Sequence, residues 1–191
     1  MTATLVGLCI VVFVATFVAT GIRAPAGESA RTLLRSLWTI EDFALMQDLG
    51  ALTATRVWLD GEWWRVLTAG FLHGSWLHLI LNMLGLWAVG RWTERAFGPW
   101  WQLVLFVVSS VGGILASLAF AEAPMVVGAS AGIFGVAGAL VVARAWGRDS
   151  IKRVLEPVDA KRLGRALVFW LLVGFALPLV GVSLLAQAGH V

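Results

Sequence analysis

The stretch TATLVGLCIVVFVATFVATGI, residues 2–22, contains no charged residue. A helix rises about 1.5 Å per residue, so this stretch is long enough to cross a hydrocarbon core of about 30 Å. A cleaved signal peptide would begin with basic residues and have a shorter apolar region. We therefore expect residues 2–22 to form a membrane span that the protein retains.

The composition of the whole chain indicates the same environment. Of its 191 residues, 60% are hydrophobic and 13% are charged, and the mean hydropathy is +0.88. Soluble domains are closer to half apolar and a quarter charged. The 11 tryptophans fit a membrane protein as well, because indole rings favour the membrane–water interface. We therefore predict an all-α protein for which lipid is the main solvent.

Further apolar stretches divide the chain into spans. We expect them at residues 75–90, 100–121, 126–146 and 166–182, with the start of a sixth at 184–191. Residues 23–74 mix charges with amphipathic segments and are expected to form a long loop at the outer interface. Too few residues follow Ser183 for another crossing. We therefore expect the sequence to be a fragment whose sixth helix is truncated after its start, and such a fragment to be poorly active.

The charges predict the orientation of the bundle. Because spans alternate direction, the segments Arg91–Arg95 and Arg144–Arg165 share one side, and they hold most of the 14 basic residues. The loop at residues 23–74 and the link around Glu122 share the other side and are more acidic. The positive-inside rule places the basic side in the cytoplasm. This predicts a cytoplasmic N-terminus, as in a bacterial inner membrane.

Several classes of ligand are not expected. The net charge of +3 and the pI of about 10.0 could suggest nucleic acid, but the sequence has no aromatic-basic motif of an RNA-binding protein. There is no phosphate-binding loop and no His/Cys cluster with metal-ligand spacing. His78 and His190 lack a third ligand for a metal. The single cysteine, Cys9, gives no information on redox compartment. We therefore expect no cofactor, no metal and no nucleic acid.

Four polar residues within the predicted spans are candidates for chemistry, because such groups are costly in lipid and are usually functional. They are His78, Asn82, Ser130 and His190. Ser130 follows Gly128 near the start of its span, where unpaired backbone N–H groups could bind an oxyanion. Small residues around it would let neighbouring helices approach closely. The alternative is a serine that hydrogen-bonds to its own helix.

His78 and Asn82 are four residues apart, so they project from one face of a helix. Both can donate hydrogen bonds to one small anion, although they could also bond structurally between helices. His73 lies at the edge of that span, and we expect it to organise the loop rather than to act as a catalyst. His190, taken alone, could be an ordinary histidine of the tail.

Taken together, these residues form a pattern. The chain contains, in order, Trp64-Arg65, His78-Leu-Ile-Leu-Asn82, Gly128-Ala-Ser130 and Ala188-Gly-His190. From about Trp63 to its end, the sequence resembles the rhomboid family of intramembrane serine proteases. The resemblance implies a bundle of six transmembrane helices that cleaves the transmembrane segments of other membrane proteins near their outer end.

The resemblance also implies roles for individual residues. Ser130 would be the nucleophile and His190 its general base, while His78 and Asn82 would stabilise the oxyanion. Structural support would come from the remaining matched positions, which are Trp64, Arg65, Gly128 and Phe134. The expected partners are transmembrane protein substrates and the lipid bilayer.

Three other functions fit the sequence less well. A soluble serine hydrolase could share the Gly128-Ala-Ser-Ala-Gly132 pattern, but it needs alternating strands and helices. A small transporter would be expected to show inverted repeats or broken helices. The main alternative is a catalytically inactive rhomboid-like protein that binds client transmembrane helices. Such relatives lose the serine or the histidine, and this sequence has both.

Overall fold

Long helices joined by short ones make up the described chain. The structure is a computed structural model that describes residues 1–25, 27–36, 40, 42–120 and 125–179. The long helices are α1 (Thr2–Arg23), α6 (Trp76–Phe97), α7 (Pro99–Phe120), α8 (Ser130–Trp146) and α10 (Ala160–Leu179). The short ones are α2 (Ser29–Ser36), α3 (Phe43–Asp48), α4 (Ala54–Trp58), α5 (Arg65–Thr68), the 3-10 turn η1 (Ala69–Phe71) and α9 (Asp149–Val154). The described residues contain no strand, in agreement with the all-α prediction.

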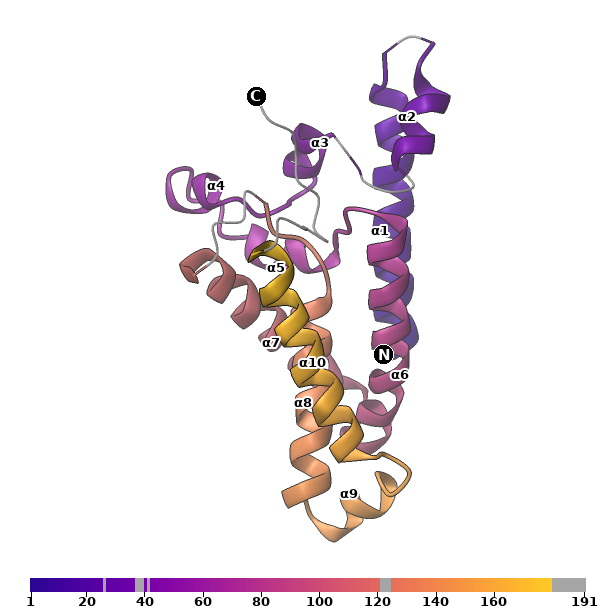
Figure 1. The fold of residues 1–191 in the computed structure, drawn as a ribbon, viewed down its shortest axis with the longest axis vertical. Coiled ribbons are helices and arrows are strands. Elements are labelled where there is room, and N and C mark those ends of the chain that lie inside the picture. The colour runs from indigo at the N-terminus through magenta and orange to yellow at the C-terminus, as the bar shows by residue number, and fades with distance from the viewer. Residues whose placement is uncertain (26, 37–39, 41, 121–124, 180–191) are drawn as a thin grey trace.

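Helix α8 packs against α6, α7 and α10, as Figure 1 shows. Its contact with α7 is made close by small residues. A Cβ added at Gly132 would meet the Ser110 hydroxyl and the Phe106 ring, and one added at Gly135 would meet Ser109. The prediction that small residues around Ser130 allow close helix packing is therefore confirmed at Gly132 and Gly135, whereas a Cβ at Gly138 would meet nothing within 4 Å.

Gly113 and Gly112, adjacent on α7, make a matched pair for testing this packing. A Cβ on Gly113 would overlap Ala131, whereas one on Gly112 would meet nothing within 4 Å. We expect Gly113→Ala to lower the free energy of unfolding by about 1–3 kcal/mol, because it overpacks the α7–α8 contact. Gly112→Ala should leave it unchanged or raise it by up to about 1 kcal/mol. Thermal unfolding in detergent measures both, and equal stability of the two variants would contradict the packing argument.

Within the part of the chain that the structure describes, two helices, α1 and Pro99–Ala119 of α7, are long and apolar enough to cross a membrane by themselves. The segment Arg65–Phe71 and helix α6 are long and apolar enough when taken together, with a bend of 92° between them. Helix α8 has 17 residues, about 25 Å of helix, which is less than the hydrocarbon thickness of about 30 Å. Residues 125–129, which lead into α8, lie outside any helix.

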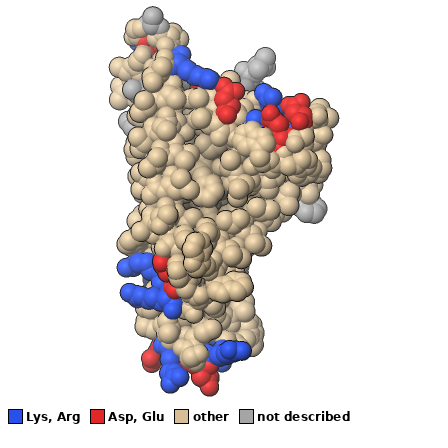
Figure 2. Space-filling view, turned by 180° about the vertical axis from the view of Figure 1, so that it is seen from behind, with Lys and Arg blue, Asp and Glu red and all other residues tan. Residues whose placement is uncertain are grey.

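The two basic segments lie at the same end of the molecule, which we call the basic end (Arg91–Arg95 and residues 144–165). Helix α9 packs there against both α6 and α8, and many of the Lys and Arg side chains gather there in Figure 2. The amino group of Met1 donates to Glu94 Oε1 at 2.6 Å, which ties the start of α1 to the same end. The opposite end, formed by the described residues between 24 and 75 and by residues 125–129, is called the loop end.

Several helix bounds differ from the expected spans. Helix α6 continues past residue 90 to Phe97 and ends at Gly98, which has φ 86°. The charged residues of its last two turns, Arg91, Glu94 and Arg95, lie at the basic end. Long side chains there can reach outward from the helix, so these charges do not end it. Helix α8 begins at Ser130 rather than at 126, and α10 begins at Ala160 rather than at 166. The expected start of a sixth span, residues 184–191, lies outside the described residues.

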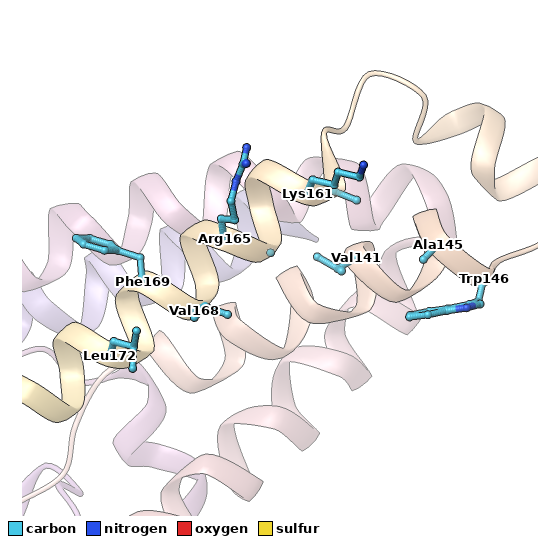
Figure 3. A pocket seen from close by; sticks show the side chains of 10 residues that line it. Val141, Ala145, Trp146, Lys161, Arg165, Val168, Phe169 and Leu172 are labelled. Atoms are coloured by element: carbon cyan, nitrogen blue, oxygen red, sulfur yellow. The ribbon is translucent and has the colours of Figure 1, made fainter.

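A cavity of about 750 Å³ lies between α8 and α10 at the basic end. Figure 3 shows its lining, which includes Val141 and Trp146 from α8 and Val168 and Leu172 from α10. Val141 is three turns along α8 from Ser130, so the cavity is remote from the candidate residues at the loop end.

Candidate functional site

Ser130 is the first residue of α8, at the loop end of the molecule. The residue before it, Ala129, is the N-cap, and no side chain caps the helix. The first N–H groups of a helix have no partner within the helix and carry its partial positive charge. The Ser130 side chain is exposed. Its hydroxyl is therefore accessible beside backbone donors.

The segment that leads into Ser130 is held by the long loop. Val126 and Leu52 exchange two backbone hydrogen bonds, of 2.8 and 3.2 Å, and the Gly128 N–H donates to the Ala69 carbonyl at 2.9 Å. Gly128 has φ 119°, a conformation that residues with a Cβ rarely adopt. These contacts explain why residues 126–129 are not helical and why α8 begins only at Ser130.

His78 lies against this segment. A Cβ added to Gly128 would stand 2.7 Å from both Cε1 and Nε2 of the His78 ring, so the imidazole packs directly on the Gly128 backbone. The ring is carried by the first turn of α6, where the Ser75 hydroxyl caps the helix by accepting from the His78 N–H at 3.1 Å. The fold therefore brings His78 to a point two residues before Ser130.

Asn82 lies one turn farther along the same face of α6. It is 8% exposed, and its Nδ2 donates to the His78 carbonyl at 2.9 Å. An amide nitrogen has two hydrogens, so one donor remains. Gly85, on the same face, approaches Ile133 of α8. The α6 face that carries His78 and Asn82 is therefore the face that packs on α8.

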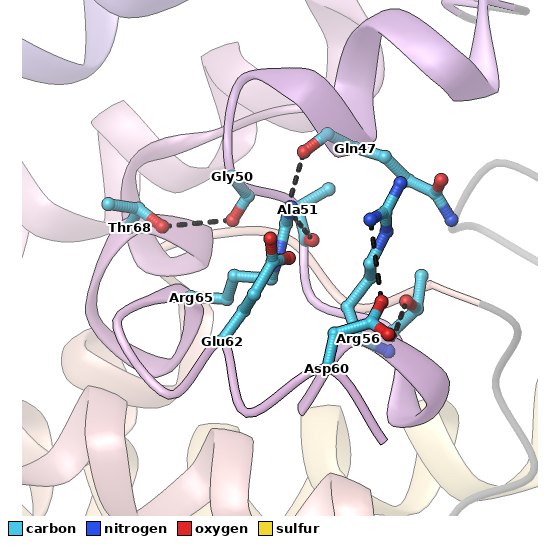
Figure 4. A network of polar contacts seen from close by, with 9 residues as sticks. Gln47, Gly50, Ala51, Arg56, Asp60, Glu62, Arg65 and Thr68 are labelled. Atoms are coloured by element: carbon cyan, nitrogen blue, oxygen red, sulfur yellow. Dashed lines mark hydrogen bonds and ion pairs between the residues drawn. The ribbon is translucent and has the colours of Figure 1, made fainter. Parts of the chain in front are cut away.

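Arg65 is buried and links distant parts of the loop end (Figure 4). Its side chain is 4% exposed, and its Nε donates to Glu62 Oε2 at 2.6 Å. Its Nη1 donates to the carbonyls of Gln47 and Ala51. The guanidinium also lies 4.5 Å from the centre of the Trp64 ring. These contacts indicate that Arg65 supports the backbone. They fix Ala51, and its neighbour in the chain, Leu52, is the residue that pairs with Val126.

The structure adds contacts that the sequence did not indicate. The backbones of Leu52 and Ala69 position the segment before Ser130, and neither residue has a side chain that signals this role. His73 is buried and its ring contacts that of His78. Phe134, one turn after Ser130, is partly buried. The proposed base, His190, lies outside the described residues.

Comparison with known proteins gives a consistent result. A family model described as Rhomboid domain matches residues 60–191. The chain is 38% identical over 96 residues to Rhomboid protease GluP of Bacillus subtilis (strain 168), covering 50% of this chain and 19% of that protein. It is 40% identical over 98 residues to RHOMBOID-like protein 5 of Arabidopsis thaliana, covering 50% of this chain and 31% of that protein. Inactive RHOMBOID-like protein 8 of Arabidopsis thaliana is 31% identical over 100 residues, covering 52% of this chain and 28% of that protein. The aligned part thus spans less than a third of the length of each of these relatives.

Proposed function

The chain belongs to the rhomboid family, and we propose that it is a serine endopeptidase that cleaves the transmembrane segments of other membrane proteins. Family membership also confirms the predicted helical membrane bundle. The observation that carries the proposal is the position of the His78 ring on the Gly128 backbone, two residues before an exposed serine at a helix N-terminus.

The proposed chemistry has two steps. In the first, His190 takes the proton of the Ser130 hydroxyl while the oxygen attacks the substrate carbonyl. The resulting oxyanion is bound by the His78 side chain, the free N–H of Asn82 and the Ser130 backbone N–H. The C–N bond then breaks, and His190 returns the proton to the leaving amine. In the second step, His190 takes a proton from water while the hydroxide attacks the acyl carbon, and His190 then gives that proton to the Ser130 oxygen as the ester bond breaks and the new carboxyl end leaves.

The proposed orientation follows from the basic end. By the positive-inside rule this end faces the cytoplasm, so the N-terminus is inside and Ser130 lies near the outer side of a bacterial inner membrane. Helix α8 is shorter than the hydrocarbon core, so its first residue lies below the outer surface. Cleavage would therefore occur near the outer end of a substrate helix, in a pocket that water can reach.

An inactive protein that binds client helices is the second candidate function. It is supported by a relative that carries the word inactive in its name. The presence of both Ser130 and His190 in this sequence favours the enzyme.

Cleavage of an artificial single-span substrate in liposomes tests the proposal. We expect the full-length protein to cut a substrate with a Gly-Ala-Ser stretch at its outer end, because an intact helix hides its amides from attack. Replacing the glycine by alanine stabilises the helix by about 1 kcal/mol and should slow cleavage about fivefold. Mass spectrometry of the fragments locates the cut.

The control substrate carries the same glycine-to-alanine change at its inner end, where the rate should not change. Binding of the substrate without any fragment would favour the inactive alternative. Cleavage that is equally fast for all the substrates would contradict the proposed need for local unwinding.

A further inference from the structure

His73 is a buried histidine that the proposed mechanism does not use. It lies between η1 and the first turn of α6, and it is 1% exposed. Its Nδ1 is 3.3 Å from the Phe71 carbonyl oxygen. A carbonyl oxygen only accepts hydrogen bonds, so Nδ1 must carry the hydrogen in this contact. In a neutral ring, the hydrogen on Nδ1 leaves Nε2 as an acceptor.

The Nε2 atom of His73 is buried and has no hydrogen-bond partner among the residues that the structure describes. Buried polar atoms are nearly always paired, so an unpaired one calls for an explanation. A packing role alone does not explain a histidine at position 73, because an aromatic hydrocarbon side chain would fill the same space without leaving an acceptor unpaired.

The neighbour of His73 is the proposed oxyanion donor. The ring centres of His73 and His78 are 5.1 Å apart and the rings are inclined by 62°, an edge-to-face contact. The His78 ring also packs on Gly128. His78 is thus confined by the Gly128 backbone and by a second imidazole, whose Nε2 acceptor is unpaired within the described part of the chain.

We propose that His73 is a positioning residue, which holds the His78 ring against Gly128 and favours the forms of that ring that carry N–H donors. This inference rests on the proposed function of His78 as an oxyanion donor. An acceptor beside an imidazole stabilises its N–H groups, above all when the ring carries a positive charge. Those are the forms of His78 that bind a developing oxyanion.

Nitrogen NMR of histidine-labelled protein in lipid tests this directly, because residues 1–191 contain only three histidines. Each ring is assigned by replacing the three residues in turn. In the parent protein we expect His73 as the neutral tautomer with its hydrogen on Nδ1. In His73→Phe we expect the ring nitrogens of His78 to shift. A parent His73 protonated at Nε2, or unchanged His78 signals in His73→Phe, would overturn the proposal.

Activity provides the second readout. In His73→Phe we expect kcat for the liposome substrate to fall tenfold to about hundredfold, as is typical of a misplaced catalytic group, with KM unchanged. His73→Gln, whose side-chain oxygen can serve as an acceptor, should recover most of this loss, and it remains informative if His73→Phe does not fold. Loss of activity that follows the melting temperature in both variants would indicate a structural role and contradict the proposal.

Trp76→Phe is the matched control. Trp76 also has a buried ring nitrogen without a partner among the described residues, but its ring contacts are with Phe13 and Phe17. We expect this variant to change neither kcat nor the His78 signals. The NMR readout does not depend on turnover, so it tests His73 even if the protein proves not to be a protease.

Discussion

Replacing Ser130 by alanine is expected to abolish both labelling by a fluorophosphonate probe and cleavage of the transmembrane substrate. In the proposed mechanism the hydroxyl oxygen forms the bond to the substrate carbonyl, and alanine has no oxygen that could replace it. Loss of the nucleophile in serine proteases lowers kcat on the order of 10⁴-fold or more. The fold should survive, since Ser130 is exposed at the first position of α8 and its side chain does not cap the helix. Intact mass before and after labelling measures the effect.

Ser110→Ala is the appropriate control for this experiment. Ser110 is a buried serine of α7 that packs against Gly132, and its hydroxyl has no partner among the described residues. Its removal should leave labelling intact and should not destabilise the protein. If Ser130→Ala is still labelled and still cleaves, Ser130 is not the nucleophile. If neither parent nor variant is labelled, the inactive alternative is the better description.

The sequence predicted those features of the site that depend on helical periodicity and on composition. The spacing of four residues places His78 and Asn82 on one face of α6, and this face packs on α8. The glycines around Ser130 indicated close helix contacts, which Gly132 and Gly135 make with α7. Both kinds of signal are local, because each follows from the identity of residues within one or two turns of a helix.

The features that could not be predicted depend on contacts between distant parts of the backbone. Leu52 and Ala69 hold the segment before Ser130 through their main-chain atoms, across more than fifty residues of sequence. Every residue type except proline can both donate and accept such bonds, so the side chains carry almost no sign of them. The late start of α8 has the same origin. The contact between His73 and His78 depends on the turn that Ser75 caps, which the apolar pattern of the span did not reveal.

Gly128→Ala is expected to combine a loss of stability with a larger loss of activity. At φ 119° a residue with a Cβ is strained, by about 1–3 kcal/mol. The added Cβ would also stand 2.7 Å from two atoms of the His78 ring, which must then move away from the segment before Ser130. A displacement of about 1 Å in a catalytic group can cost 10²-fold in rate. We therefore expect kcat/KM to fall about 10²-fold in protein that remains folded.

Gly98→Ala separates the two causes. Gly98 also has positive φ, 86°, but a Cβ there would meet nothing within 4 Å, and it lies at the basic end between α6 and α7. This variant should therefore lose stability through backbone strain alone and keep the kcat/KM of the parent below its melting temperature. Thermal unfolding and substrate cleavage are measured on both variants. Because only Gly128→Ala displaces the His78 ring, equal activity of the two variants would mean that the position of His78 on Gly128 has no part in catalysis, and the proposed oxyanion site would have to be abandoned.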